Sequence, residues 1–287
     1  MMGHGEGARP LWLLLVWPLL LAAPALCWRD WRDSDSDNDV MPATGEPDDY
    51  NVSTAYAGGA LDILRLLNVS GGTPGVRVVA GLAPGLEAYR LRPAYGRVRL
   101  PAPQAVTAAL TAPTGFTLVF VYRQQRKSLG TLLSVHSPGK VSPWLQLTSN
   151  QRTGQMLLHY RLQGDRKLHQ LSWPLWAGHG GSVAEARRAS SGWTHVAAAW
   201  QPGAGRLLVH LDCAPPRRLR LASRAPLHVP TDALVYFRQE PGLKKKFLGT
   251  IQVAKLLPYA SQMQQEWTCN GTHPQLSSKE IPSVVAL

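Results

Sequence analysis

The fold is decided by a series of short apolar runs in the middle of the chain. They read FTLVFVY (116–122), TLLSV (131–135), WLQL (144–147) and QMLLHY (155–160), and Gly, Pro, Ser or Asn residues separate each run from the next. The runs are rich in β-branched and aromatic residues, which favour strands. Short strands at regular spacing, with turn residues between them, are typical of β-sandwiches. This stretch therefore predicts a series of strands.

Similar runs continue on both sides of this stretch. They are VRVV (76–79), YRL (89–91) and VRL (98–100) before it, and LHQL (168–171), THVAAAW (194–200), RLLVHL (206–211), RRLRL (217–221), LVYF (234–237) and FLGTIQV (247–253) after it. Apolar residues recur at helical spacing only at 62–67, where Asp62 suits the first turn and Gly71 and Gly72 end the helix. We therefore predict an all-β fold, an antiparallel β-sandwich or jelly roll with one short N-terminal helix.

The first 27 residues predict a secretory signal peptide. Arg9 precedes the apolar run at 11–21, and small residues that include Ala25 and Cys27 follow it. The alternative is a signal anchor, but the apolar core is short, Pro18 interrupts it and acidic residues follow it. No other segment reaches the roughly 18 apolar residues that a membrane-spanning helix needs. We therefore expect a secreted, extracellular protein with no membrane span.

Charge divides the rest of the chain into an acidic leader and a basic body. Segment 28–50 carries eight Asp and Glu residues with almost nothing apolar between them, which predicts a disordered leader. From Asn51 onward there are 27 Lys and Arg against 9 Asp and Glu, a net charge of 27 − 9 = +18, above the +12 of the whole chain. We expect one domain at 51–271, because no linker-like stretch interrupts it, and a flexible tail at 272–287.

The positive charge of the body is the main indication of function. A field of this sign attracts polyanions, and outside the cell the abundant ones are sulfated glycosaminoglycans rather than nucleic acid. Paired guanidinium groups suit sulfates because each can donate to two anionic oxygens. Residues i and i+2 of a strand share a face. Arginines at this spacing, and a run of lysines in a predicted hairpin turn, give the candidate polyanion-binding residues Arg90, Arg92, Arg97, Arg99, Arg218, Arg220, Lys244, Lys245 and Lys246.

The favoured set within these candidates is Arg218, Arg220 and the three lysines, since all five belong to the carboxyl-terminal half and could lie close together. A bland alternative remains open. Excess arginine can serve solubility alone, and a basic turn is often an ordinary solvated tip that also blocks pairing between sheet edges. The eight carboxylates of the leader are expected to act as an internal competitor for polyanions, in a salt-sensitive way.

Cysteines and glycosylation motifs fit the extracellular compartment. If Cys27 leaves with the signal peptide, Cys213 and Cys269 remain, and in an oxidising compartment the simplest expectation is one disulfide bond between them. Asn-x-Ser/Thr motifs stand at Asn51, Asn68 and Asn270. Together with the signal peptide, they predict a secreted glycoprotein.

The order of the runs resembles a known family. The residues that carry the resemblance are LDILRLL (61–67), GFTLVF (115–120), GTLLSV (130–135), GQMLLHY (154–160), GWTHVA (192–197), LLVHLDC (207–213) and FLGTIQV (247–253) with Cys269. They resemble the thrombospondin N-terminal-like domain, a laminin-G-like, concanavalin-like sandwich, over roughly 60–269, and among its members the NELL-type secreted glycoproteins look closest. The resemblance implies an intradomain disulfide at Cys213 and Cys269 and heparin binding through basic side chains, at positions that do not transfer residue by residue.

Catalytic and metal sites are not expected. The acidic residues of the body are scattered singly, without the carboxylate pair of a glycosidase, and no Gly-x-Ser-x-Gly motif is present. The histidines lack metal-ligand spacing, and the carboxylates are too dispersed for a calcium site. We therefore predict no enzymatic activity, no cofactor and no required metal.

Two classes of function remain. The first is an extracellular module that binds heparan sulfate or another sulfated glycosaminoglycan through basic surface clusters. The second is a protein-interaction module for a receptor, a growth factor or a matrix protein, with the charge incidental. Exposure of Trp173 and Trp176 beside Pro174 would favour the second class.

Overall fold

The computed structural model describes residues 59–83, 85–92, 95–96, 98–175, 192–212, 214–260, 267–270 and 273–276, the last two ranges by their backbone. The chain divides into two units, Met1–Met41 and Pro42–Leu287, and all the described residues belong to the second unit.

The larger sheet, sheet A, has its strands in an order far from their sequence order. Its path runs β11-β10-β9-β4-β13-β3-β2, and β1 also pairs with β13. All pairs are antiparallel. The strands are β1 (Leu61–Asp62), β2 (Val76–Ala80), β3 (Glu87–Leu91), β4 (Phe116–Gln124), β9 (Trp193–Gln201), β10 (Arg206–Leu211), β11 (Arg217–Arg220) and β13 (Gly249–Leu257).

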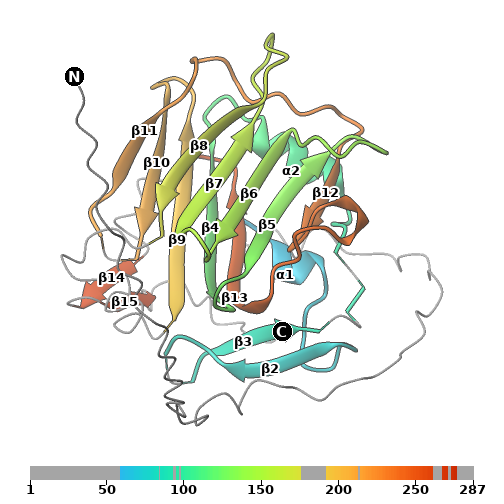
Figure 1. Cartoon of the computed structure of the whole chain (residues 1–287), viewed down its shortest axis with the longest axis vertical. Helices are drawn as coiled ribbons and strands as arrows, with labels where there is room; N and C mark the ends of the chain where they lie inside the picture. The colour runs from blue at the N-terminus through green and yellow to red at the C-terminus, as the bar shows by residue number, and fades with distance from the viewer. Residues whose placement is uncertain are drawn as a thin grey trace, which may run out of the picture. The chain divides into compact units, whose positions relative to one another are not determined.

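The second sheet, sheet B, lies across the first. Its order is β12-β5-β6-β7-β8, also antiparallel, and Figure 1 shows β5 to β8 in front of β4, β9 and β13. The strands are β5 (Leu129–His136), β6 (Leu145–Asn150), β7 (Gln155–Tyr160), β8 (His169–Pro174) and β12 (Leu234–Phe237). A separate two-stranded sheet consists of β14 (Trp267–Asn270) and β15 (His273–Leu276).

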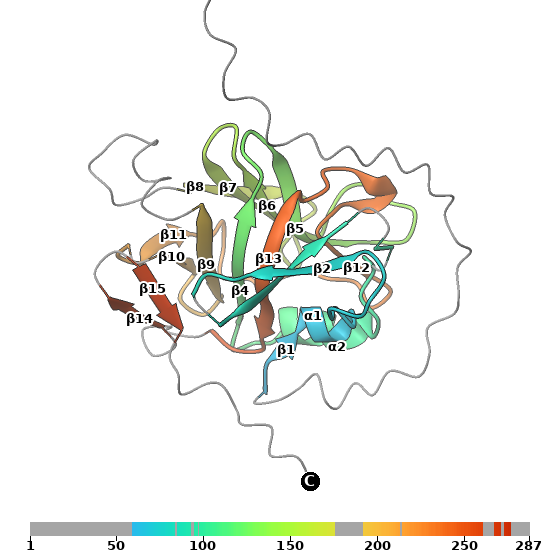
Figure 2. The ribbon, with the colours of Figure 1, turned by 90° about the horizontal axis from the view of Figure 1, so that it is seen from below.

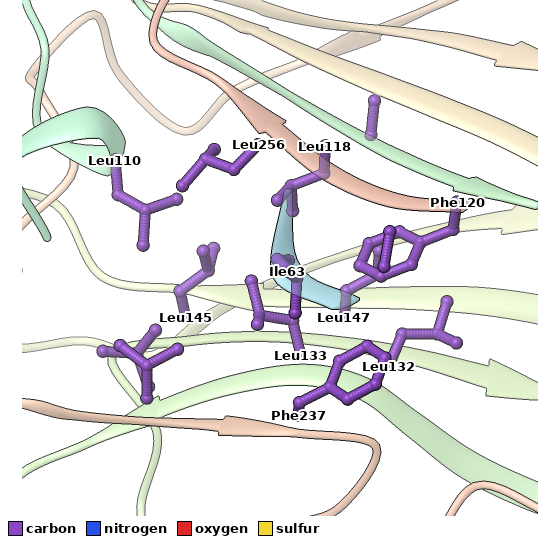
Figure 3. Close-up of a cluster of buried hydrophobic side chains, with 14 of the residues drawn as sticks. Ile63, Leu110, Leu118, Phe120, Leu132, Leu133, Leu145, Leu147, Phe237 and Leu256 are labelled. Carbon is purple, nitrogen blue, oxygen red and sulfur yellow. The ribbon is translucent and has the colours of Figure 1, made fainter. Parts of the chain in front are cut away.

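The core lies between the two sheets. Alternation along each strand directs one set of side chains inward, and these form one large cluster of buried apolar residues from both sheets. Figure 3 shows its centre, where Leu118, Phe120 and Leu256 of sheet A face Leu133, Leu147 and Phe237 of sheet B. The predicted antiparallel β-sandwich is therefore confirmed.

The helices differ in part from the prediction. Helix α1 (Ile63–Leu66) forms where expected, and the Asp62 side chain caps it by accepting hydrogen bonds from the backbone N–H groups of Leu64 (3.0 Å) and Arg65 (3.1 Å). The prediction of a single short helix is wrong, because a second helix, α2 (Pro103–Leu110), and a short 3-10 helix, η2 (Pro241–Leu243), are also present. Both α1 and α2 contact β13, and Figure 2 shows them beside β1.

The sequence of α2 carries two signals of a helix that the prediction did not use. Proline stands at its first position, where the missing N–H costs nothing, and Val106, Ala109 and Leu110 form a buried i, i+3, i+4 face.

The run VRL at 98–100, predicted as a strand, makes only an isolated bridge between Arg99 and Tyr236.

Candidate anion-binding site

The candidate site lies on the outer face of sheet A at its β11 edge, the left edge of sheet A in Figure 1. Residues directly opposite each other on paired strands share a face. Leu207 of β10 lies opposite Trp200 and Leu219, and all three turn toward the core. Their neighbours Arg206, Leu208, Arg218 and Arg220 therefore turn outward. Both Arg218 and Arg220 are exposed.

These outward arginines line a hollow. Its volume is about 420 Å³, and its walls are the turn before β10, strand β11 and the segment after β11. Four arginines belong to it, namely Arg206, Arg218, Arg220 and Arg224. We call these four residues the arginine hollow. No Asp or Glu is among its lining residues, which are Ala204, Gly205, Arg206, Arg218, Leu219, Arg220, Leu221, Ala222, Ser223 and Arg224.

A glycine brings the fourth arginine into place. Gly205 has φ +61°, a left-handed conformation that glycine adopts without strain. A Cβ at Gly205 would stand 3.1 Å from Cγ of Arg224, so the aliphatic stem of Arg224 lies directly over this glycine. A residue from beyond β11 thus packs over the turn that precedes β10.

The pairing of the arginines is electrostatically unfavourable by itself. Arg206 and Arg220 stand directly opposite each other. The backbone N–H of Leu221 donates to the carbonyl of Gly205 (3.0 Å), so the next pair along, Arg206 and Arg220, is a non-hydrogen-bonded pair whose side chains lie especially close. Like charges in this position reduce stability. The partner of the Arg206 Nε–H is a neutral amide oxygen, Oε1 of Gln201, at 2.6 Å.

The arrangement suits a multiply charged anion. The four arginines come from β10, from β11 and from the segment after β11, and they line one hollow. Each guanidinium presents donors in a planar fork that matches sulfate or carboxylate oxygens. Gln201, which lies directly opposite Arg206 on β9, accepts from Nε of this guanidinium and does not occupy its terminal nitrogens. Bound anions would also relieve the repulsion between Arg206 and Arg220.

The predicted lysine cluster lies elsewhere and in a different setting. Residues 241–246 belong to a connection from β12 of sheet B to β13 of sheet A. Within it, Glu240 and Lys244 form an isolated antiparallel bridge around η2, so the predicted hairpin turn is present as this single bridge rather than between two neighbouring strands of one sheet. The backbone N–H of Thr131 in β5 donates to the carbonyl of Lys245 at 2.9 Å. In sheet B, β6 separates β5 from β7. The segment that follows β11 contacts β7 rather than β5, because the Ala222 N–H donates to the hydroxyl of Tyr160 (3.1 Å). The structure therefore does not bring the lysines to Arg218 and Arg220.

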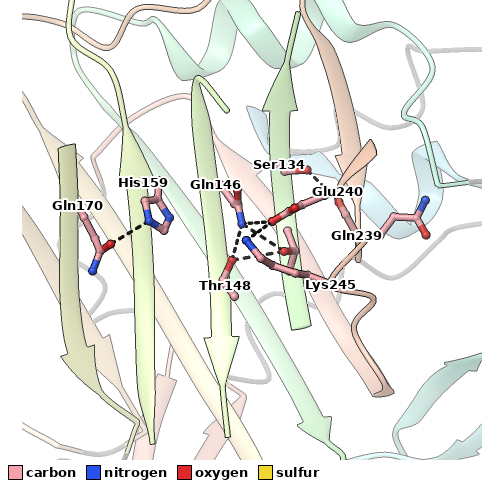
Figure 4. Close-up of polar contacts among 9 residues, drawn as sticks. Ser134, Gln146, Thr148, His159, Gln170, Gln239, Glu240 and Lys245 are labelled. Carbon is pink, nitrogen blue, oxygen red and sulfur yellow. Dashed lines mark hydrogen bonds and ion pairs between the residues drawn. The ribbon is translucent and has the colours of Figure 1, made fainter. Parts of the chain in front are cut away.

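Lys245 is neutralised by a buried carboxylate. Its Nζ lies 2.7 Å from Oε1 of Glu240, which is 4% exposed. The same oxygen accepts a hydrogen bond from Nε2 of Gln146 (2.6 Å), which also donates to Thr148 (2.9 Å). Figure 4 shows this network on the outer face of sheet B. Lys244 is exposed and Lys246 is half-buried.

The remaining basic candidates are dispersed. Arg90 lies in β3, opposite Arg77 of β2 and Thr250 of β13, toward the other end of the strand order from β11. Arg92 follows β3, and its carbonyl accepts from the buried guanidinium of Arg238 at 3.3 Å. Arg99 bridges to Tyr236 at the edge of sheet B, and Arg97 lies outside the described residues. These arginines do not join the hollow.

Sequence reasoning missed Arg206 and Arg224. Arg206 opens a strand directly after Gly205. No arginine stands two residues before or after it, so the i, i+2 spacing does not reveal it. The signal that could have found it is the register of a hairpin, since β10 and β11 are consecutive strands joined by a short connection. Arg224 follows β11 in an irregular segment, and only the fold of that segment brings it to the hollow.

Several other predictions fall on residues that the structure does not describe. Cys213 and Asn51 lie outside the described residues, and of Cys269 and Asn270 only the backbone in β14 is described. Asn68 is exposed in the turn after α1, with φ 52°. Trp173 is 2% exposed and belongs to the core, so it offers no surface for a partner, and Trp176 lies outside the described residues.

Two of the isolated acidic residues accept hydrogen bonds from neighbouring groups. Asp165 accepts from His169 (2.7 Å) and Asp212 accepts from the backbone N–H of His195 (2.9 Å). Partial burial raises the pKa of Asp212 to about 7, and burial lowers the pKa of His136, His159 and His210. Within the described ranges, no three His, Cys, Asp or Glu side chains gather closely enough to hold a metal ion.

No helix among the described residues is both long and apolar enough to cross a bilayer.

Comparisons with known proteins give a partial relationship. No protein-family model matches the chain. Bovine thrombospondin-2 is 27% identical over 163 residues, which cover 55% of this chain and 12% of thrombospondin-2. Among solved structures, the CBM40 of the Ruminococcus gnavus IT-sialidase bound to α2,3-sialyllactose has 16% identity and a TM-score of 0.40 over 56% of this chain and 84% of that one. The binding domain of botulinum neurotoxin DC in complex with rat synaptotagmin II has 7% identity and a TM-score of 0.38 over 61% and 37%. The chain is thus similar in sequence to a small part of a thrombospondin.

Proposed function

We propose that this chain is an extracellular binding module of a secreted glycoprotein and that its arginine hollow binds sulfated glycosaminoglycans such as heparan sulfate. The observation that carries the proposal is the convergence of Arg206, Arg218, Arg220 and Arg224 on one hollow with no carboxylate among its lining residues. Similarity to part of bovine thrombospondin-2 supports an extracellular role, and a relationship to the NELL-type glycoproteins belongs to the same proposal.

The spacing of the arginines explains the choice of ligand class. Arg218 and Arg220 stand two positions apart on β11, a distance of about 6.6 Å along the strand. Arg206 lies directly opposite Arg220 on β10, in a non-hydrogen-bonded pair. A ligand that carries several sulfates on adjacent sugars presents anionic groups at repeated short intervals. It can therefore engage more than one guanidinium at once, whereas a single small anion neutralises only part of the hollow.

The test compares two triple variants that remove the same charge. One variant carries Arg206→Gln, Arg218→Gln and Arg220→Gln, and the matched control carries Lys244→Gln, Lys245→Gln and Lys246→Gln. Heparin affinity is measured by calorimetry and by elution from a heparin column at several salt concentrations. We expect the arginine variant to lose at least about tenfold in affinity, equivalent to roughly 1.4 kcal/mol, and the lysine control to lose less than about twofold.

The outcomes separate the competing explanations. Equal losses in the two variants would mean that net charge alone attracts heparin, as a solvated basic surface does. A greater loss in the lysine control would move the site to sheet B. Circular dichroism and secretion yield confirm that each variant folds, so that a loss of affinity reports on the binding surface.

A further inference from the structure

One side of β11 presents free backbone groups. Because the N–H of Leu221 donates to the carbonyl of Gly205 beside β10, alternation assigns the backbone groups of Leu219 to β10 as well. The backbone N–H and C=O groups of Arg218 and Arg220 therefore point away from β10. In the part of the chain that the structure describes, no strand pairs with that side of β11, which ends sheet A in Figure 1.

The side chains of β11 carry a dense positive charge. The strand reads RRLR at 217–220, and Arg217, Arg218 and Arg220 are all exposed. Arg217 is not among the residues that line the arginine hollow, whereas the other two are. β11 is therefore an extended, basic strand at an edge of its sheet.

The Arg220 end of β11 is held by opposing contributions. Arg220 stands directly opposite the like charge of Arg206, which reduces stability. Leu221 acts in the other direction, because its side chain is 4% exposed and its N–H donates to Gly205. The connection that follows, 221–233, contains no helix and no strand beyond a single bridge. Local opening of this end therefore depends on the Leu221 anchor set against a like-charge pair.

An endoprotease with carboxylates in its substrate subsites is complementary to this strand. Trypsin recognises the residue before the scissile bond through a carboxylate in its specificity pocket, and guanidinium groups pair bidentately with carboxylates. A protease that holds its substrate as an added strand also takes main-chain hydrogen bonds from alternate residues. In β11 these alternate residues are Arg218 and Arg220. The carbonyl of Arg220 and the backbone of Arg218 thus face the same open side.

We propose that the Arg220–Leu221 bond is a cleavage site for an endoprotease whose acidic subsites bind Arg217 and Arg220, and that a ligand in the arginine hollow protects this bond. Water adds to the carbonyl carbon of Arg220 and the C–N bond breaks, which leaves a carboxylate on Arg220 and a protonated amine on Leu221. Cleavage separates Arg224 from the other arginines of the hollow, so it regulates anion binding there. The protection rests on the proposed function, whereas the cleavage does not.

A bound polyanion protects by acting on the opening step. A sulfated chain that contacts Arg206 on β10 and Arg220 on β11 removes their repulsion and joins the two strands. Proteolysis of a folded chain follows the population of the opened state when opening and closing are fast. A ligand that binds the closed state alone lowers this population by mass action, so the rate of cleavage falls with it.

The first experiment measures cleavage without any polyanion. The full chain is treated with furin, which recognises basic residues upstream of the bond as well as the one before it, and in parallel with trypsin, which recognises the one before it. Mass spectrometry follows the new amino terminus at Leu221. We expect Arg217→Gln to slow furin cleavage of this bond at least about tenfold and trypsin cleavage by less than about twofold, since one charge-assisted pair is lost with furin alone.

Two controls make this experiment decisive. Arg220→Gln should abolish cleavage by both enzymes, and circular dichroism verifies that each variant folds. The synthetic peptide PPRRLRLASR (215–224) gives the rate for an unfolded site. If furin cuts the peptide but leaves the folded chain intact, or cuts neither, the cleavage site is refuted.

The second experiment measures protection. Trypsin is added with and without a heparin oligosaccharide at about ten times its Kd, and the Lys140–Val141 bond serves as the reference, because it lies in the exposed turn between β5 and β6 where Val141 is 57% exposed. We expect heparin to slow cleavage at Arg220–Leu221 about tenfold and at the reference bond by less than about twofold. Equal slowing of both bonds would mean that heparin acts on the protease.

The two proposals fail in different ways. If calorimetry detects no heparin binding, the proposed function fails, while cleavage after Arg220 in the first experiment stands. If heparin binds and the Arg220–Leu221 bond is cut at an unchanged rate, the regulation of the hollow by cleavage is overturned. Arg217→Gln, which lies outside the hollow, should change heparin affinity by less than about twofold.

Discussion

The arginine hollow on sheet A and the Lys245 connection on sheet B start from similar sequence and end in opposite electrostatic states. Each contains a short basic run, RRLR at 217–220 and KKK at 244–246, and both belong to the unit Pro42–Leu287. At the connection, a buried carboxylate meets the ammonium group at 2.7 Å. At the hollow, the described side chain that accepts a hydrogen bond from Arg206 is the amide of Gln201. The difference teaches that formal charge in a sequence becomes available for ligands only where the fold supplies no counter-charge.

The two regions also divide stability and function differently. Glu240 and its partners satisfy one another on the outer face of sheet B, which stabilises the crossing from β12 to β13. Arg206 and Arg220 face each other at the edge of sheet A, which costs stability. A protein that retains such a cost at its surface is expected to gain binding from it.

The largest expected loss of stability concerns the sheet B network. Glu240→Ala removes the acceptor of Gln146 and the partner of Lys245, and it leaves a buried amide donor with fewer partners. We expect the free energy of unfolding to fall by about 1–3 kcal/mol, measured by urea denaturation. Heparin affinity should stay within about twofold of the natural chain. A large drop in affinity with little loss of stability would show that this network takes part in binding.

Asp212 is a third electrostatic case, a largely buried carboxyl group that accepts from the backbone N–H of His195. Burial raises its pKa to about 7 from the ordinary value of 3.8. Between about pH 4 and pH 7 the folded chain therefore keeps a proton on Asp212 that the unfolded chain has released. The contribution of Asp212 to stability is thus complete below about pH 4 and is lost as the pH rises toward 7.

Asp212→Asn tests this third case, because asparagine can still accept the hydrogen bond from His195 N–H but does not ionise. We expect the stability of the variant relative to the natural chain to increase between pH 4 and pH 7, by roughly 1 kcal/mol per pH unit in the steepest part, and to level off above. Denaturation at several pH values measures it. A constant difference across this range would mean that Asp212 titrates normally.

Gln201→Glu converts the hollow into the state of the lysine connection. The change keeps the shape of the side chain that accepts from Arg206 and introduces a carboxylate. We expect heparin affinity to fall about fivefold, close to 1 kcal/mol, while stability stays equal or rises by up to about 1 kcal/mol. Gln170→Glu, on the exposed face of β8, is the matched control with the same charge change, and its affinity should fall by less than about twofold.

The smallest effect is expected from relief of the like-charge pair. Arg220→Thr replaces a cation opposite Arg206 by a strong strand former. We expect stability to increase by about 0.2–1 kcal/mol and heparin affinity to decrease. Thermal unfolding with and without heparin measures both quantities. A decrease in stability would show that the guanidinium of Arg220 has a structural role in the edge.

Most strands of the fold could be predicted from the sequence because alternation and turn residues are local signals. QMLLHY at 155–160, RLLVHL at 206–211 and LVYF at 234–237 form strands with the predicted ends. Helix α2 was missed because its short apolar face, Val106 with Ala109 and Leu110, stands among small residues. Only half of the hollow was predicted, since Arg218 and Arg220 share a strand whereas Arg206 and Arg224 reach them through hairpin register and a glycine turn.

The sequence by itself determined the sandwich class, the excess of positive charge in the body and the spacing of arginines along β11, because strand periodicity and composition do not depend on distant residues. Only the tertiary structure decided which charges remain available. Glu240 and Lys245 are five residues apart, yet Gln146 from another strand completes their network. Whether a cation is neutralised depends on what the sheet register and the chain crossings bring within a few ångströms, and Coulomb energies fall too quickly with distance and solvent exposure for sequence proximity to stand in for that.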